Sequence, residues 1–217
     1  MSIHSLHADA ATIEGVKPKS KIDFELDLEG FTSVSLLSYA GLNWRSAAVA
    51  DGYRLFGEDA PESGYITGIT SGKQVVFDAG GRSMGFSASG SFDFKSVQMT
   101  AAWSQDLTVK ITGYRDGEKM YSTTIHVTDD APTLVKLNWK GVDQVEMKPS
   151  HAVIDPDQPY TGNHFVMDDL VIANLVSPAP VERALDRAFA ADTVAPADEA
   201  FAFAGSQHAI AQVTALV

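Results

Sequence analysis

The stretch LTVKITGYRDGEKMYSTTIHV, residues 107–127, decides the fold. On both sides of its centre, β-branched and aromatic residues alternate with polar ones, which is typical of half-buried strands. The central pair Asp116–Gly117 tolerates the positive φ angles of a tight hairpin turn. The stretch therefore predicts two antiparallel strands joined at residues 115–117.

Stretches with the same character continue in both directions along the chain. They are KIDFELDL (21–28), SVSLLSYAGLNW (33–44), KQVVFDAGG (73–81), SFDFKSVQMTAAW (91–103), two strands about a KGVD turn in 133–149, and a last strand in 163–173. A glycine-rich, loop-like section fills residues 47–72, and no convincing helix separates the strands. Many short strands of this kind predict an all-β fold, an antiparallel jelly-roll β-sandwich.

These patterns divide the chain into three predicted segments. Residues 1–20 should form a flexible leader, residues 21–175 should form the sandwich, and residues 176–217 should form an irregular or partly helical C-terminal extension. The N-terminus has neither the basic nor the apolar region of a secretory signal peptide, and no stretch is apolar enough to span a bilayer. The protein is therefore expected either to stay in the cytoplasm or to leave by a route without an N-terminal signal.

Composition narrows the function classes. The chain has 217 residues, 45% of them hydrophobic, a formal net charge of −12 and no cysteine. The acidic balance disfavours nucleic acid and anionic membranes as partners and is compatible with cations or neutral sugars. The absence of cysteine excludes disulfides, thiol catalysis and cysteine-based zinc sites.

Carboxylates occur in both the first and the last predicted strand. Asp168 and Asp169 are adjacent in the last strand, so one of them should face inward, where an unpaired carboxylate is costly. Asp23 and Glu25 lie in the first strand, and the two strands could pair. Oxygen ligands of this kind suit Ca²⁺, whereas acids that face solvent would need no metal.

At this point the ordered series of stretches resembles a known group of domains. KIDFELD, YAGLNW, FDFKSVQMTAAW, the hairpin at 107–127, LVKLNWKGVDQVEM and FVMDDL look like bacterial extracellular jelly-roll domains, which are common in exopolysaccharide-associated and PEP-CTERM-type exported proteins. These are similar in turn to the galactose-binding-like β-sandwiches of carbohydrate-binding modules. The resemblance covers residues 21–173. It implies a structural Ca²⁺ held by Glu25 with Asp23 in the first strand and by Asp168, or else Asp169, in the last.

The C-terminal segment departs from the PEP-CTERM pattern. It has no terminal Pro-Glu-Pro, no membrane span and no basic tail, and its end, AFAFAGSQHAIAQVTALV (200–217), looks more like an uncleaved type I secretion signal. That likeness implies an extracellular or cell-surface location. The alternative is an assembly arm that is donated to a neighbouring subunit.

Aromatic residues supply the candidate sugar contacts. Sugars stack their apolar C–H faces on aromatic rings while polar groups bind their hydroxyls. Trp44 ends a strand, and Tyr53, Tyr65 and Tyr160 fall in glycine- or proline-rich loops, where binding residues concentrate. Trp103 and Trp139 sit in apolar strand patterns and are expected in the core.

Enzyme signatures are absent from the sequence. It has no GxSxG elbow, P-loop or dinucleotide-binding GxGxxG, and TSGK at 70–73 lacks the context of a P-loop. The expected function is a non-catalytic, exported, calcium-stabilised module that binds cell-surface or matrix polysaccharide. The alternative is a structural protein that self-assembles into a surface layer, filament or biofilm matrix.

Overall fold

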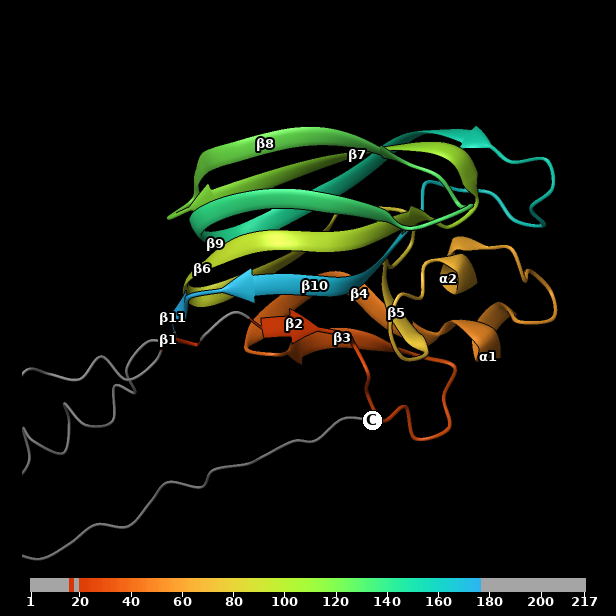
Figure 1. The fold of residues 1–217 in the computed structure, drawn as a ribbon, viewed down its shortest axis with the longest axis horizontal. Coiled ribbons are helices and arrows are strands. Elements are labelled where there is room, and N and C mark those ends of the chain that lie inside the picture. Colours follow the sequence, from red (N-terminus) through yellow and green to blue (C-terminus); the bar gives the residue numbers. More distant parts are fainter. Residues whose placement is uncertain (1–15, 18–19, 177–217) are drawn as a thin grey trace, which may run out of the picture. The chain divides into compact units, whose positions relative to one another are not determined.

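The fold is an antiparallel β-sandwich, which confirms the predicted all-β class. A computed structural model describes residues 16–17 and 20–176, and strands account for most of them (Figure 1). Contacts within the chain divide it into Met1–Ala179 and Pro180–Val217. The predicted extension and its secretion-like tail, and with them the assembly-arm alternative, lie outside the described residues except at residue 176.

The described strands and helices run in chain order. They are β1 Val16–Lys17, β2 Ser20–Ile22, β3 Ser33–Tyr39, β4 Leu42–Asp51, α1 Gly52–Phe56, α2 Gly64–Thr67, β5 Gln74–Asp78, β6 Met84–Ala101, β7 Ser104–Arg115, β8 Glu118–Val127, β9 Thr133–Ile154, β10 Phe165–Ala173 and β11 Leu175–Val176. Among the described residues, no helix is long and apolar enough to cross a membrane.

Nine strands form one hydrogen-bonded sheet that folds over on itself. Its order is β2-β10-β5-β4-β6-β9-β7-β8, with β3 added on β4 and a further pairing between β10 and β6. Strands β4, β5, β10 and β6 therefore close a ring. In Figure 1, β7, β8 and β9 lie on one side and β2, β3, β4 and β5 on the other. The first and last strands of the sandwich do pair, as predicted, with Leu170 opposite Ile22.

Strand β6 pairs with strands of both layers. The first part of β6, residues 85–87, pairs with β4, and its later part, from Asp93, pairs with β10. Strand β9 is also continuous, so the turn predicted at KGVD is wrong. Gly141 has a φ of +65°, and its N–H donates to Asp93 Oδ1 at 3.0 Å. A glycine in such a strand marks an irregularity in the ladder rather than a reversal of the chain.

Two hairpin turns have positive φ angles at both central residues. The predicted turn between β7 and β8 is confirmed, with φ of 52° at Asp116 and 80° at Gly117. A second turn, at Ala40 (φ 55°) and Gly41 (φ 80°), splits the single strand predicted over 33–44 into β3 and β4. Alanine carries no usual signal for this turn, because a Cβ disfavours positive φ.

The first predicted strand is shorter than its pattern. Only Ser20–Ile22 forms β2, and the ladder ends before Phe24, which has a φ of 58°. The apolar side chains of the pattern nevertheless turn inward, since Ile22, Phe24 and Leu28 are all buried. The alternation of 21–28 therefore predicted burial correctly but not the extent of the strand.

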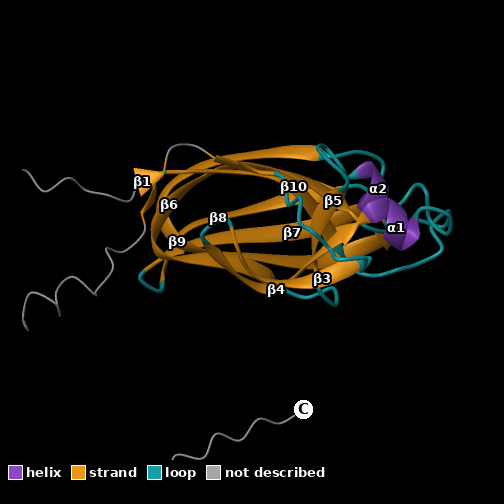
Figure 2. Ribbon diagram, turned by 90° about the horizontal axis from the view of Figure 1, so that it is seen from below, coloured by secondary structure: helices purple, strands orange, loops and turns teal. Residues whose placement is uncertain are grey.

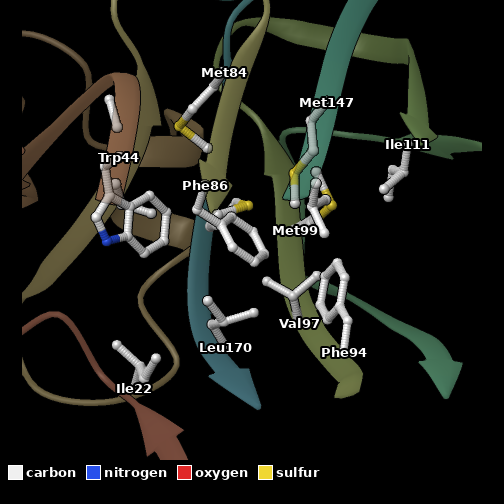
Figure 3. Packing of buried hydrophobic residues seen from close by; sticks show 14 of the residues in the cluster. Ile22, Trp44, Met84, Phe86, Phe94, Val97, Met99, Ile111, Met147 and Leu170 are labelled. Carbon is white, nitrogen blue, oxygen red and sulfur yellow. The ribbon is translucent and has the colours of Figure 1, made fainter. Parts of the chain in front are cut away.

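The core between the layers is aromatic and methionine-rich. Figure 3 shows Phe86 in contact range of Trp44, with Met84, Met99 and Met147 around them. The Phe86 ring lies 5.0 Å from that of Trp44 and 5.5 Å from that of Phe94. Burial of these side chains from both layers provides most of the driving force for the sandwich.

Both short helices lie at one end of the sandwich, in the section that was predicted as loop (Figure 2). At the start of α1, Asp51 accepts a hydrogen bond from the Arg54 N–H at 3.1 Å. At the start of α2, the Gly64 N–H donates to Ala102 O at 3.0 Å, and a Cβ at Gly64 would overlap the backbone of Ala101. Helix α2 therefore packs closely against the end of β6.

Candidate functional site

Five aromatic rings gather at the helical end of the sandwich; we call them the aromatic cluster. They come from α1 (Tyr53, Phe56), α2 (Tyr65), the turn between β6 and β7 (Trp103) and the loop before β10 (Tyr160). Phe56, Trp103 and Tyr160 form the centre, with ring centroids 5.0 Å apart for Phe56–Trp103, 5.0 Å for Trp103–Tyr160 and 5.6 Å for Phe56–Tyr160. Tyr53 belongs to the cluster by position, one helical turn before Phe56.

The aromatic cluster has a buried floor and an exposed surface. Trp103 and Tyr65 are 4% and 3% exposed, whereas Tyr160 is 44% and Tyr53 63% exposed. A cavity of about 270 Å³ is lined by residues 53–59, which include Tyr53 and Phe56 of the cluster. Tyr160 is therefore a half-exposed ring held from below by other rings, an arrangement that fixes its orientation before any ligand arrives.

Two of the four aromatic residues predicted to bind ligand are core residues instead. Trp44 is 5% exposed, packs against Phe24 and Phe86, and donates from Nε1 to Tyr39 O at 3.3 Å. Tyr65 packs beneath Phe56 and Trp103. Neither presents a free ring face, because a large ring at a strand end or in a loop still gains most by burial. Tyr53 and Tyr160 keep their predicted exposure.

The inward-facing carboxylate of the last strand is Asp168, which is fully buried. Its Oδ2 accepts hydrogen bonds from Thr70 N at 2.8 Å, Thr70 Oγ1 at 2.9 Å and Ser71 N at 2.8 Å. Its Oδ1 accepts one from Asp169 N at 2.6 Å. Burial raises the pKa of Asp168, and the N–H donors of the 70–71 loop oppose that rise. These hydrogen bonds therefore offset the cost of burying the Asp168 carboxylate.

The other predicted metal ligands surround the same loop, residues 70–74. Glu25 Oε1 accepts from Lys73 N at 2.7 Å and Gln74 N at 2.8 Å. Asp169 pairs with Lys21 Nζ at 2.8 Å; burial opposes its ionisation, but Lys21 and Ser71 outweigh burial and lower the pKa of Asp169. Asp23 accepts only from Glu25 N, at 3.5 Å.

Glu25, Asp168 and Asp169 thus each accept hydrogen bonds from the 70–74 loop. In the part of the chain that the structure describes, no three or more acidic or histidine side chains are grouped as a metal site would require. A Cβ at Gly72, which has a φ of +60°, would overlap the Glu25 carboxylate, so the loop fits closely over this side chain. Calcium binding by Asp23, Glu25, Asp168 and Asp169 stays a prediction.

A buried acid that was not predicted, Asp78, ends strand β5. Its Oδ1 accepts from Phe165 N at 2.8 Å and lies 3.6 Å from His164 Nδ1, while its Oδ2 has no hydrogen-bond partner in the part of the chain that the structure describes. Burial raises the pKa of Asp78 from 3.8 to about 6, despite these donors. Asp78 in turn raises the pKa of His164, which burial partly opposes. The pair therefore holds a proton more tightly in the folded state than in the unfolded chain.

This proton affinity sets the sign of a pH effect on stability. Asp78 loses its proton at about pH 4 when unfolded and about pH 6 when folded, so stability falls as pH rises between these values. His164 adds to the fall as pH rises through its raised pKa. We expect the free energy of unfolding to drop by about 1 kcal/mol from about pH 5 to about pH 8 because of Asp78 alone.

Urea unfolding of wild type and Asp78→Asn across this pH range measures the effect. The variant should show a clearly flatter profile, and the exposed-residue control Asp59→Asn should follow the wild type. A profile of Asp78→Asn that is as steep as that of the wild type would show that Asp78 is ionised without penalty.

A second cavity, of about 280 Å³, lies on the outer face of β4, β6 and β9. Its rim carries Asn43, Arg45, Ser87 and Gln144. Arg45 pairs across Gly85 with Glu146 at 3.1 Å. The two aromatic residues among its lining residues, Trp44 and Phe86, are buried, so this hollow lacks the exposed ring that Tyr160 provides at the helical end.

Several residues of the helical end escaped sequence analysis. Phe56 follows Tyr53 by three residues, the spacing of one helical turn, which is a usable though short signal. Segments distant in sequence cover Asp78, Ser63 and Asp129, so the local sequence gives no signal that these residues are buried.

No family model matches the sequence, and no curated protein matches it. Solved structures are similar in fold. A DUF4465 family protein from Bacteroides caccae has a TM-score of 0.47 at 9% identity, over 78% of this chain and 91% of that one. A second, from Bacteroides ovatus, has 0.44 at 11%, over 79% and 95%. The CBM22-1 xylan-binding domain of Xyn10C from Paenibacillus barcinonensis has a TM-score of 0.35 at 15% identity, over 68% of this chain and 94% of that one. At these identities the likeness concerns the fold alone.

Proposed function

We propose that this protein is a non-catalytic carbohydrate-binding module whose ligand surface is formed by Tyr160 and Tyr53. The observation that carries the proposal is Tyr160, which is 44% exposed while its ring rests on Trp103 and Phe56. We further propose that the protein acts outside the cell, on cell-surface or matrix polysaccharide, because such polymers are found there.

Pre-organisation is the physical reason for this choice. A sugar ring stacks its C–H face on an aromatic ring, and a ring that is already held in place loses little conformational freedom on binding. The neighbouring segment 53–59 adds the exposed carboxylates of Glu58 and Asp59, which can accept hydrogen bonds from sugar hydroxyls. With a net charge of −12, a neutral glycan is favoured over an anionic one.

The test is retardation in native gels that contain neutral β-linked polysaccharides, followed by titration with oligosaccharides of whichever polymer binds. Tyr160→Ala should weaken binding at least about tenfold, and Tyr53→Ala should weaken it less, because a central, backed ring contributes more than a peripheral one.

Tyr121→Ala is the matched control, because Tyr121 stacks on Trp139, away from the helical end, with ring centroids 5.3 Å apart. It should bind like wild type. Equal loss in Tyr121→Ala, or unchanged binding in Tyr160→Ala, would refute the site. Release of reducing ends from the bound polymer would refute the non-catalytic role.

A further inference from the structure

Asp129, in the loop between β8 and β9, is a buried carboxylate that is 1% exposed. Among the described residues, neither its Oδ1 nor its Oδ2 has a hydrogen-bond partner. Ser63 Oγ, at the start of α2, is fully buried and has no partner within residues 20–176 either. Buried polar atoms are nearly always paired, and an unpaired charge is the most costly case.

Hydrogen bonds bring these two residues and a third loop to one place. Thr67 Oγ1 contacts both Ser63 O, at 3.3 Å, and Asp129 O, at 2.5 Å. Gln158 Nε2 donates to Glu62 O at 3.0 Å, which joins the loop before β10 to the residue preceding Ser63. The Gln158 amide also lies close enough to favour the charged form of Asp129, although no hydrogen bond is formed.

Negative charge accumulates at this point. Burial raises the pKa of Asp129, and the nearby carboxylates of Asp155 and Asp130 raise it further. Asp155 is itself 9% exposed, and its Oδ1 accepts from Asp157 N at 2.9 Å and Gln105 Nε2 at 3.4 Å. The described residues near Asp129 thus supply acidic and neutral oxygens but no lysine or arginine that pairs with it.

We propose that Asp129, Asp155 and Ser63 form a site for a hard divalent cation of the calcium type. Ca²⁺ takes carboxylate, hydroxyl and amide oxygens together with water, and it tolerates irregular geometry. Two carboxylates and the Ser63 hydroxyl match that preference, and the cation would neutralise the buried charge. The site is separate from the carboxylates held by the 70–74 loop and does not depend on the sugar-binding proposal.

A bound cation would also affect the aromatic cluster. Asp155 and Tyr160 lie in the same loop, five residues apart, so a cation on Asp155 would restrain the segment that carries Tyr160. Gln158, between them, is already tied to Glu62.

The test is calorimetric titration of the full chain, stripped with EGTA, with CaCl₂, combined with thermal unfolding in CaCl₂ and in EGTA. Wild type should bind Ca²⁺ saturably and unfold several degrees higher with it. Asp129→Asn and Asp155→Asn should lose both effects. Asp129→Asn removes a buried charge, so in EGTA it should fold at least as stably as wild type.

Glu25→Gln is the control that separates the two groups of acids, and it should keep the calcium response. The proposal is overturned if wild type shows no saturable binding, if Asp129→Asn retains the shift, or if Glu25→Gln alone abolishes it. Absence of binding together with a higher unfolding temperature for Asp129→Asn would show that Asp129 is simply a protonated structural acid.

Discussion

Trp103→Ala is expected to lower the free energy of unfolding by about 3–5 kcal/mol, the range for deleting a large buried aromatic side chain. Trp103 is 4% exposed, and its ring lies within 5.3 Å of three others, those of Phe56, Tyr65 and Tyr160. Three of the segments that meet there, α1, α2 and the loop before β10, are short or irregular and can partly collapse into the cavity, so a loss toward the lower end of this range is expected.

Urea unfolding followed by circular dichroism measures this loss. Trp103→Phe keeps a ring in the same place and should cost clearly less than the alanine variant. A loss below about 1 kcal/mol for Trp103→Ala would mean that the helical end contributes little to the cooperative core. Where the variant still folds, Tyr160 loses its backing, so glycan binding should also weaken.

Asp168→Ala is expected to lower the free energy of unfolding by about 3 kcal/mol in EGTA. The substitution removes the acceptor for Thr70 N, Ser71 N and Asp169 N, and each buried donor left unpaired costs about 1–3 kcal/mol. Water can reach part of the loop, which keeps the total near the lower end of the sum.

Asp169→Ala is the neighbouring control. It removes a partly exposed ion pair with Lys21, a kind of pair that contributes about 0–1 kcal/mol. If Asp168→Ala is harmless in EGTA and destabilising only in Ca²⁺, the predicted calcium site is supported and the hydrogen-bond account fails. Equal losses in both solutions would support the hydrogen bonds.

Local patterns predicted the features that local forces determine. The turn at Asp116–Gly117 forms where the sequence favours positive φ, and strands on both sides follow their alternation. The continuity of β9 was missed because it depends on Asp93, 48 residues away, which takes the Gly141 N–H. Helices α1 and α2 were missed because five and four residues are too few to show a helical period.

Prediction of the site was limited in the same way. Tyr53 and Tyr160, which were chosen from loop composition, are exposed, whereas the burial of Tyr65 and Trp44 depends on neighbours from other elements. The sequence showed that one of the two adjacent acids in the last strand should be buried. It did not show that backbone N–H groups nearly one hundred residues earlier, at Thr70 and Ser71, would bind the buried carboxylate of Asp168.

The short pairing of β1 with β11 has a consequence for how the protein can be attached. Val16 lies opposite Val176 and Lys17 opposite Leu175, so the polypeptide enters and leaves the sandwich at a single point. Figure 2 shows this point at the end opposite α1 and α2. The chain therefore enters and leaves the domain at one end, and Tyr53 and Tyr160 lie at the other. If the domain is attached through either of these two ends of the chain to a longer polypeptide, a bead or a sensor chip, Tyr53 and Tyr160 will face away from the attachment.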